Sequence, residues 1–259
     1  MTPDHRDSGL LPRFGLIWPP LLAFAGLLVT WQAAATLTGT PTVIAPSPLD
    51  VAAAAADAAP LLLGAGLTTA TTAVLGLCAG VVAGLCIAFA MTASATAASA
   101  FYPYLVALRV APLVAFAPLV FLWFGNETAT RAAMVATLTT FPVAVASLNG
   151  LRSTPAAYLD LAESVGAPAH RIFLRVRVPA AAPSVLAGVK LAAAVSVTGT
   201  VVVEFLTLRG GLGTRVVRAS TALDTAGMFA ALFALACLGL GFYAVPAAVE
   251  NVVTRNANG

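Results

Sequence analysis

Six long apolar segments, each bounded by charge, proline or glycine, alternate with shorter polar segments along the chain. A helix needs roughly 20 residues to cross about 30 Å of hydrocarbon. The segments are continuously apolar rather than alternating, which favours helices over barrel strands. The pattern therefore predicts about six transmembrane helices, at residues 14–37, 61–91, 102–124, 132–148, 185–206 and 228–249.

The composition makes lipid the most suitable solvent for this chain. Of its 259 residues, 60% are hydrophobic and 9% are charged, and the mean hydropathy is +0.95. Soluble globular proteins are about 25% charged, so a water-facing surface of this composition would aggregate. We therefore predict an all-α integral membrane protein. The net charge of +3 is too small for a nucleic-acid-binding surface.

The first apolar segment has features of both a signal peptide and a membrane anchor. Arg6 and Arg13 precede it, and the alanines at 33–35 resemble a signal-peptidase site. We favour a retained anchor, because the segment is longer than a typical signal-peptide core and more spans follow. Residues 1–40 are assigned to an N-terminal tail and the first helix, and residues 41–259 to the membrane core.

The distribution of Lys and Arg predicts the orientation, because cytoplasmic loops carry an excess of these residues. An even number of spans puts both termini on one side of the membrane. If that side is cytoplasmic, it carries Arg6, Arg13, Arg152, Arg171, Arg175, Arg177 and Arg255, with Lys190 close by, against Arg131, Arg209, Arg215 and Arg218 on the other. We therefore predict a multi-pass protein of the plasma or inner membrane with both termini in the cytoplasm.

Small residues recur once per turn in the second predicted span, at Gly76, Gly80 and Gly84. This spacing lets the backbones of two membrane helices approach closely, so we expect a compact bundle. The three cysteines also lie in apolar segments, at spacings that suit neither a metal cluster nor a disulfide framework. We expect them to be small buried side chains: Cys78, Cys86 and Cys237.

The one long polar segment, at about 150–184, lies between the fourth and fifth predicted spans. Thr154 is a candidate N-cap, Pro155 suits the first turn of a helix, and Gly166 suits its C-terminal exit. A second short helix is expected from Pro168 to just before Pro179, because helices usually end ahead of a proline. Residue types alone fit a basic amphipathic helix on anionic lipid equally well, through Arg171, Arg175 and Arg177 interleaved with Ile172, Phe173 and Val176.

The spacing within this segment resembles a family signature. Asp160-Leu161-Ala162 is followed after three residues by Gly166, and nine residues later by Val176-Arg177-Val178-Pro179. This pattern resembles the E-A-A-x3-G-x9-I-x-L-P signature of the permease subunits of bacterial ATP-binding-cassette (ABC) importers. Asp stands for Glu, Leu for the first Ala, and Val for Ile and Leu.

Further segments, in matching order, are similar to the nitrate, sulfonate and taurine subfamily of these permeases. They cover most of the chain from about Ile44 onward: 44–48 (IAPSP), 109–112 (RVAP), 118–125 (PLVFLWFG), 202–205 (VVEF) and 210–213 (GGLG). The resemblance implies a type I importer permease fold. It also implies a homodimer of permeases around a central pathway, and an extracytoplasmic solute-binding protein that delivers the substrate.

The resemblance also implies which part of the chain is coupled to ATP hydrolysis. In this family a coupling helix before the glycine docks on a separate cytoplasmic ATPase, present in two copies, which uses ATP and Mg²⁺, and the permease binds no cofactor. The coupling residues implied here are Tyr158, Asp160, Leu161, Ala162, Glu163, Gly166, Ala167, Arg171 and Pro179. Independently, the sequence contains no G-x-x-x-x-G-K-[ST] phosphate loop, since its one lysine, Lys190, lacks the Gly-rich lead-in. We therefore do not expect an enzyme.

Two ionisable residues lie within predicted spans, where a charge costs at least about 2.5–3.5 kcal/mol on insertion scales. Glu204 fits a pathway or outer gate as well as a structural hydrogen bond or ion pair. Arg109 would suit an anionic substrate in the pathway, but its length also lets it reach back to the cytoplasmic surface, which we favour.

Two other classes of membrane protein fit the sequence less well. An intramembrane serine protease needs a histidine within a span, whereas His5 and His170 fall outside, and a metal enzyme needs clustered ligands. A self-sufficient secondary transporter or channel would leave the polar segment unexplained, and the chain has no evident internal repeat. The expected substrate is a small anion such as nitrate, a sulfonate or taurine, with a thiamine-precursor-like molecule as the alternative.

Overall fold

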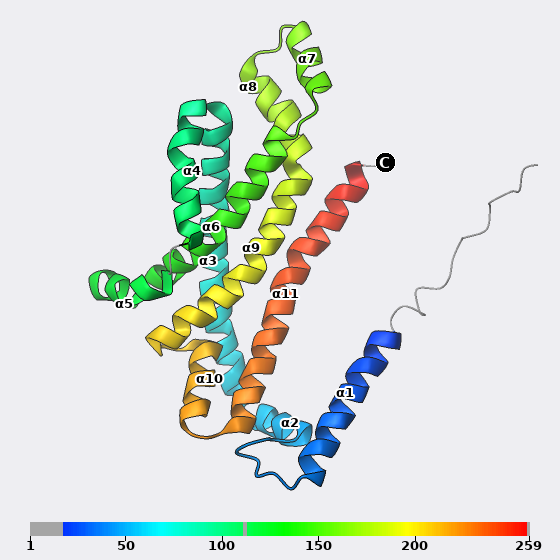
Figure 1. Cartoon of the computed structure of the whole chain (residues 1–259), viewed down its shortest axis with the longest axis vertical. Coiled ribbons are helices and arrows are strands. Elements are labelled where there is room, and N and C mark those ends of the chain that lie inside the picture. Colours follow the sequence, from blue (N-terminus) through cyan, green and yellow to red (C-terminus); the bar gives the residue numbers. More distant parts are fainter. Residues whose placement is uncertain (1–17, 111–112, 258–259) are drawn as a thin grey trace, which may run out of the picture.

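The structure, a computed structural model, describes residues 18–110 and 113–257, and every element in this part of the chain is a helix (Figure 1). Three long helices run side by side at its centre: α3 (Ala59–Ala93), α6 (Thr128–Arg152) and α9 (Val178–Thr207). The other helices are α1 (Trp18–Leu37), α2 (Pro48–Asp57), α4 (Ala95–Val110), α5 (Leu113–Phe124), α7 (Ala156–Ser164), α8 (Ala169–Ile172), α10 (Gly211–Thr221) and α11 (Thr225–Ala257). A π-helical turn, Phe173–Arg177, joins α8 to α9.

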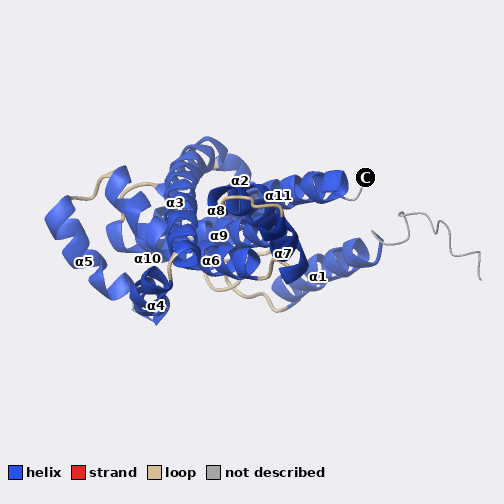
Figure 2. Cartoon of the chain, turned by 90° about the horizontal axis from the view of Figure 1, so that it is seen from above, coloured by secondary structure: helices blue, strands red, loops and turns tan. Residues whose placement is uncertain are grey.

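Among the described residues, five helices are long and apolar enough to cross a membrane, and they correspond to five of the six predicted spans. The third predicted span, 102–124, is instead divided between α4 and α5, two shorter apolar helices. The two helices are described up to Val110 and from Leu113, on either side of Pro112. α5 projects from the side of the bundle, opposite α1 (Figures 1 and 2).

Helices α3 and α6 touch backbone to backbone along the predicted glycine positions. A Cβ atom at Gly76 would lie 2.5 Å from Val135 Cβ, and one at Gly84 would lie 2.9 Å from the carbonyl oxygen of Thr140. The Thr139 hydroxyl also reaches across to the carbonyl oxygen of Gly76, at 3.2 Å. The close helix contact predicted from the glycine spacing is thus confirmed.

Helices α6 and α9 approach each other by the same means. A Cβ atom at Gly150 would lie 2.7 Å from Ser184 Cβ, and one at Gly188 would lie 2.6 Å from Ala146 Cβ. In lipid, helices gain no hydrophobic driving force from packing against each other, so close van der Waals contact at small residues has to stabilise the pair. α3, α6 and α9 therefore form one closely packed unit.

The flanking helices are attached to this unit through side chains. Lys190 of α9 forms an ion pair with Glu250 of α11, and its ammonium lies 5.9 Å from the ring centre of Tyr243. α1 contacts α11 through Trp31, whose ring centre lies 5.5 Å from that of Phe229. No local sequence pattern pairs Lys190 with Glu250, because the two residues lie 60 positions apart in different helices.

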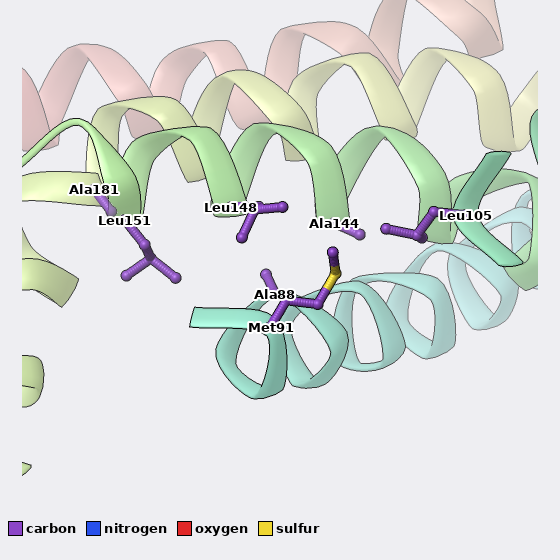
Figure 3. Close-up of a cluster of buried hydrophobic side chains, with 7 residues drawn as sticks. All are labelled: Ala88, Met91, Leu105, Ala144, Leu148, Leu151 and Ala181. Carbon is purple, nitrogen blue, oxygen red and sulfur yellow. The ribbon is translucent and has the colours of Figure 1, made fainter. Parts of the chain in front are cut away.

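A cluster of buried apolar side chains closes the end of the bundle that carries α7 and α8. It joins α3, α4, α6 and α9 through Ala88, Met91, Leu105, Ala144, Leu148, Leu151 and Ala181 (Figure 3). Phe173, in the π-helical turn, packs against the cluster and meets Phe89 edge-on, with ring centres 5.3 Å apart. This cluster fixes the base of the polar segment to the membrane bundle.

The outward faces of the long helices expose many large apolar residues, as expected of a surface that faces lipid. The prediction that the three cysteines are buried is wrong, because Cys78, Cys86 and Cys237 are all exposed and free. In a membrane protein, an apolar side chain loses nothing by facing the hydrocarbon, so position in an apolar segment does not imply burial.

We predict that alanine lowers the stability of the bundle at one glycine of α3 and not at another. At Gly80 a Cβ atom would lie 1.9 Å from Thr139 Oγ1 and 2.9 Å from the carbonyl oxygen of Ala136, whereas at Gly64 it would meet nothing within 4 Å. Gly80→Ala should therefore destabilise the bundle by about 1–3 kcal/mol, and Gly64→Ala should not. Thermal unfolding in a mild detergent measures both, and equal midpoints for the two variants would contradict the packing described.

Candidate functional site

The polar segment forms a protruding module made of α7, the turn after it, α8 and the π-helical turn (Figure 1). No residue of α7 is buried. Tyr158, Leu161 and Val165 are 59%, 65% and 74% exposed. Their spacing of three and four residues puts them on one face of the helix. A short helix that is not among the candidate membrane spans thus presents an apolar face that the described part of the chain leaves exposed.

The start of α7 differs from the prediction. Thr154 was expected to cap the helix, but Pro155 occupies the N-cap position and no side chain caps the helix. The Thr154 hydroxyl is buried and donates instead to the carbonyl oxygen of Leu151, at 3.3 Å. The Thr154 hydroxyl therefore satisfies one of the free carbonyl groups at the C-terminal end of α6, the preceding helix.

The end of α7 agrees with the prediction that Gly166 forms its exit. Gly166 has φ +71°, a left-handed conformation that favours glycine. Its N–H donates to the carbonyl oxygen of Glu163 at 2.9 Å, and the N–H of Ala167 donates to that of Ala162 at 3.0 Å. This pair of bonds is a Schellman motif, and it sets the direction in which the chain leaves α7.

The predicted end of the second short helix before Pro179 is wrong. α8, the π-helical turn and α9 form one continuous helix from Ala169 to Thr207. Pro179 falls in the first turn of α9, directly after the π-helical turn. A π-helical turn widens the helix locally. This turn lies where Pro179, which has no N–H, would interrupt the backbone hydrogen bonds of an α-helix. The module is therefore joined to a membrane span without a flexible loop.

The charged residues of the module lie on its surface. Asp160 and Glu163 are exposed on α7, and Arg171 and Arg175 are exposed beyond the glycine turn. Within the described part of the chain, none of these four forms an ion pair. A groove of about 520 Å³ lies between this module and the end of α3, lined in part by Glu163, His170, Leu174 and Arg177.

The residues implied for coupling gather in this module. Tyr158, Asp160, Leu161, Glu163, Gly166, Arg171 and Pro179 are exposed, while Ala162 and Ala167 are half-buried. All of them lie on α7, on the glycine turn or at the start of the long helix that follows. In this arrangement an apolar helix face is bordered by exposed charge of both signs.

The two residues considered for the pathway lie elsewhere. Arg109 is in the last turn of α4, and its side chain lies outside the described residues. Glu204 is fully buried in the last turn of α9, where its carboxylate accepts a hydrogen bond from Thr69 at 2.9 Å and one from the N–H of Gly213 at 2.8 Å. Of the two interpretations considered for Glu204, its burial and these bonds favour the structural hydrogen bond.

Sequence reasoning did not identify Thr69 as the partner of Glu204. A carboxylate in an apolar span requires a buried donor, so a partner on another helix could have been expected. The second span, however, offers Thr68, Thr69, Thr71 and Thr72, and the sequence alone does not say which one faces Glu204. That choice depends on how α3 is rotated against α9.

Comparison with known proteins gives consistent matches. Residues 76–255 match the family described as "Binding-protein-dependent transport system inner membrane component". The chain is 34% identical to the formylaminopyrimidine transport permease protein ThiX of Halalkalibacterium halodurans, over 90% of this chain and 94% of that protein. It is 32% identical to the riboflavin transport system permease protein RibX of Chloroflexus aurantiacus, over 92% and 91% of the two chains.

A solved structure has a similar fold. The crystal structure of an amino acid ABC transporter with histidines superposes with a TM-score of 0.63. The match covers 78% of this chain and 96% of the other, at 17% sequence identity. At this identity the comparison concerns the fold alone.

Proposed function

Because this chain belongs to the family of inner membrane components of binding-protein-dependent transport systems, we propose that α7 is the helix through which a separate ATPase drives solute import. The family, the permease fold and the function as the permease subunit of an ABC importer, all predicted from the sequence, are confirmed by the comparisons. Such a permease is a multi-pass, non-catalytic membrane subunit, and its importer includes an ATPase and a solute-binding protein.

One observation carries the assignment of α7. It is a helix outside the membrane with no buried residue, and three of its apolar side chains, Tyr158, Leu161 and Val165, are more than half exposed on one face. Burying such a face against a partner gains about 25 cal/mol for each Å² of apolar surface removed from water. A helix face that residues 18–110 and 113–257 leave uncovered is best explained by a partner that covers it.

The charges around this face support a protein partner. Asp160 and Glu163 lie on α7, and Arg171 and Arg175 lie just beyond the turn, all exposed. Charge of both signs at the rim of an apolar contact selects a complementary surface and speeds association. A uniformly basic rim would have suited anionic lipid better.

We infer that the end carrying α7 faces the cytoplasm. Arg152, Arg171, Arg175 and Arg177 lie at this end, in agreement with the excess of positive charge on the cytoplasmic side. The C-terminal end of α11 points the same way (Figure 1). We further propose two copies of the permease and two of the ATPase, because a permease chain with a single coupling helix is most simply paired with itself.

For the substrate, we propose a flat, nitrogen-containing ring compound rather than a small inorganic anion. The two relatives named above match about nine-tenths of this chain and are named for a pyrimidine and for riboflavin. Both compounds contain a planar, nitrogen-containing ring system. The small anions considered from the sequence remain the alternative.

Uptake measurements distinguish the two substrate classes. Cells that express the complete importer should accumulate radiolabelled formylaminopyrimidine, and unlabelled riboflavin or formylaminopyrimidine should compete better than an aliphatic sulfonate. Cells that lack only the permease provide the control. Preferential competition by the sulfonate would contradict the substrate proposal and leave the assignment of α7 unaffected.

The assignment of α7 is tested by Leu161→Asp, which places a charge in the centre of the exposed apolar face. We expect the detergent-solubilised variant to bind the ATPase at least about tenfold more weakly, because central apolar contacts dominate interface energies. The control is Leu223→Asp, at a residue that is similarly exposed, 69% against 65%. Leu223 lies in the connection between α10 and α11, which is at the opposite end of the molecule from α7 (Figure 1). Equal ATPase binding by the two variants would contradict the proposal.

Gly166 provides a second test, with Gly125 as its matched control. Both glycines have positive φ, +71° and +73°, and neither would bring a Cβ atom within 4 Å of a neighbour. Valine should therefore cost about 1–2 kcal/mol of backbone strain at either position. Only Gly166→Val should reduce the amount of solute imported per ATP hydrolysed, because it alone changes the direction of the chain leaving α7. The ratio is measured in proteoliposomes, and a wild-type ratio for Gly166→Val would exclude this role of the turn.

A further inference from the structure

The turn between α9 and α10, at the end of the bundle opposite α7, is held by three helices at once. Leu208, Gly210 and Gly211 in this turn all have positive φ, at +50°, +71° and +86°. Side chains from α3, α6 and α9 each bond to the turn or to the first residues of α10. One short segment is thus bonded to three different helices.

The contact from α9 is made by the buried carboxylate of Glu204. One carboxylate oxygen accepts the N–H of Gly213 at 2.8 Å, and the other accepts the hydroxyl of Thr69 at 2.9 Å. The Thr69 oxygen in turn accepts the N–H of Leu212, also at 2.9 Å. Two of the free N–H groups at the start of α10 are thus satisfied by side-chain oxygens.

The glycines of the GGLG segment are explained by this carboxylate. A Cβ atom at Gly211 would lie 1.9 Å from Glu204 Oε1, and one at Gly213 would lie 2.9 Å from Glu204 Oε2. A side chain at either position would displace the carboxylate. The VVEF and GGLG segments, noted separately in the sequence, therefore form one contact.

The contact from α6 is made by Arg131, which is also buried. Its guanidinium donates to the carbonyl oxygen of Arg209 in the turn, at 2.8 Å, and to the hydroxyl of Thr128, at 3.1 Å. Arg131 is 7% exposed. Two side chains that are costly to bury therefore hold one short segment: Arg131 bonds to the turn, and Glu204 bonds to the start of α10.

We propose that Glu204, Thr69 and Arg131, hereafter the outer clamp, position α10 so that movement of the coupling module reaches the outer end of the transporter. The helix that begins in the module at Ala169 runs without interruption to Thr207, and Glu204 lies in its last turn. The outer clamp fixes α10 to that helix, to α3 and to α6. α10 must then move with the bundle rather than independently of it.

This inference rests on the proposed role of α7, since it concerns where movement that enters at α7 is delivered. Its residues are positioning residues, because they act through the placement of α10. If the outer clamp is loosened, the ATPase should still bind and hydrolyse ATP, but the outer end should no longer follow. The expected defect is uncoupling rather than loss of assembly.

The test is Thr69→Val in the assembled importer, reconstituted with its ATPase and solute-binding protein. The substitution keeps the shape of the side chain but removes the hydroxyl that links Glu204 to Leu212. The matched control is Thr71→Val, on the same helix, because the Thr71 hydroxyl bonds only to the carbonyl oxygen of Leu67 in its own helix. Gly211→Ala serves as a second variant that disturbs the same contact from α10.

We expect Thr69→Val and Gly211→Ala to lower solute imported per ATP by at least about fivefold, with ATP hydrolysis within about twofold of wild type. Thr71→Val should leave both unchanged. A wild-type ratio in both clamp variants would overturn the proposal. So would a proportional fall of transport and hydrolysis, which indicates a role in stability alone. Both ratios are measured only on complexes that retain the ATPase. Failure of the α7 assignment would be seen in a different experiment, the binding of the ATPase to Leu161→Asp.

Discussion

The fold depends on direct backbone contact between helices at glycine. Lipid removes the hydrophobic driving force that holds helices together in water, so α3 and α6 are held by close packing at Gly76, Gly80 and Gly84. The Thr139 hydroxyl adds a bond across the contact, to the carbonyl oxygen of Gly76. α9 joins the pair through Gly150 and Gly188 in the same manner. These helices are too close for side chains to slide past each other, and the three therefore behave as one unit.

Both ends of this unit carry features that suit energy coupling. At one end, α7 exposes an apolar face and is connected through Gly166 and the π-helical turn to α9. At the other end, the outer clamp fixes α10 to the same three helices. α11 packs along α9 and α10 and forms the Lys190–Glu250 ion pair, whereas the contacts of α1 are few and are made with α2 and α11, such as Trp31 on Phe229. The permease thus combines a closely packed centre, which suits the transmission of rigid-body movement, with a first helix that has little contact with it.

The sequence predicted the features that depend on local spacing. The apolar segments located five of the six spans, the four-residue glycine repeat indicated the α3–α6 contact, and Gly166 was correctly placed at the exit of α7. The errors concern features set by contacts between distant residues. The helix continues past Pro179 through a π-helical turn, and Thr69 meets Glu204 across 135 residues of sequence. No local pattern specifies either one, because each depends on how neighbouring helices are rotated and packed.

The most direct test of a rigid unit that links the coupling helix to the outer end is structural. The assembled importer should be determined by electron cryomicroscopy without nucleotide and with ATP bound. The account predicts that α3, α6, α9 and α10 superpose as one body in both states, with Thr69 and Gly213 still bonded to Glu204, while this body rotates relative to its neighbours. Movement of α10 relative to α9 between the two states, with the bonds to Glu204 broken in one of them, would contradict it.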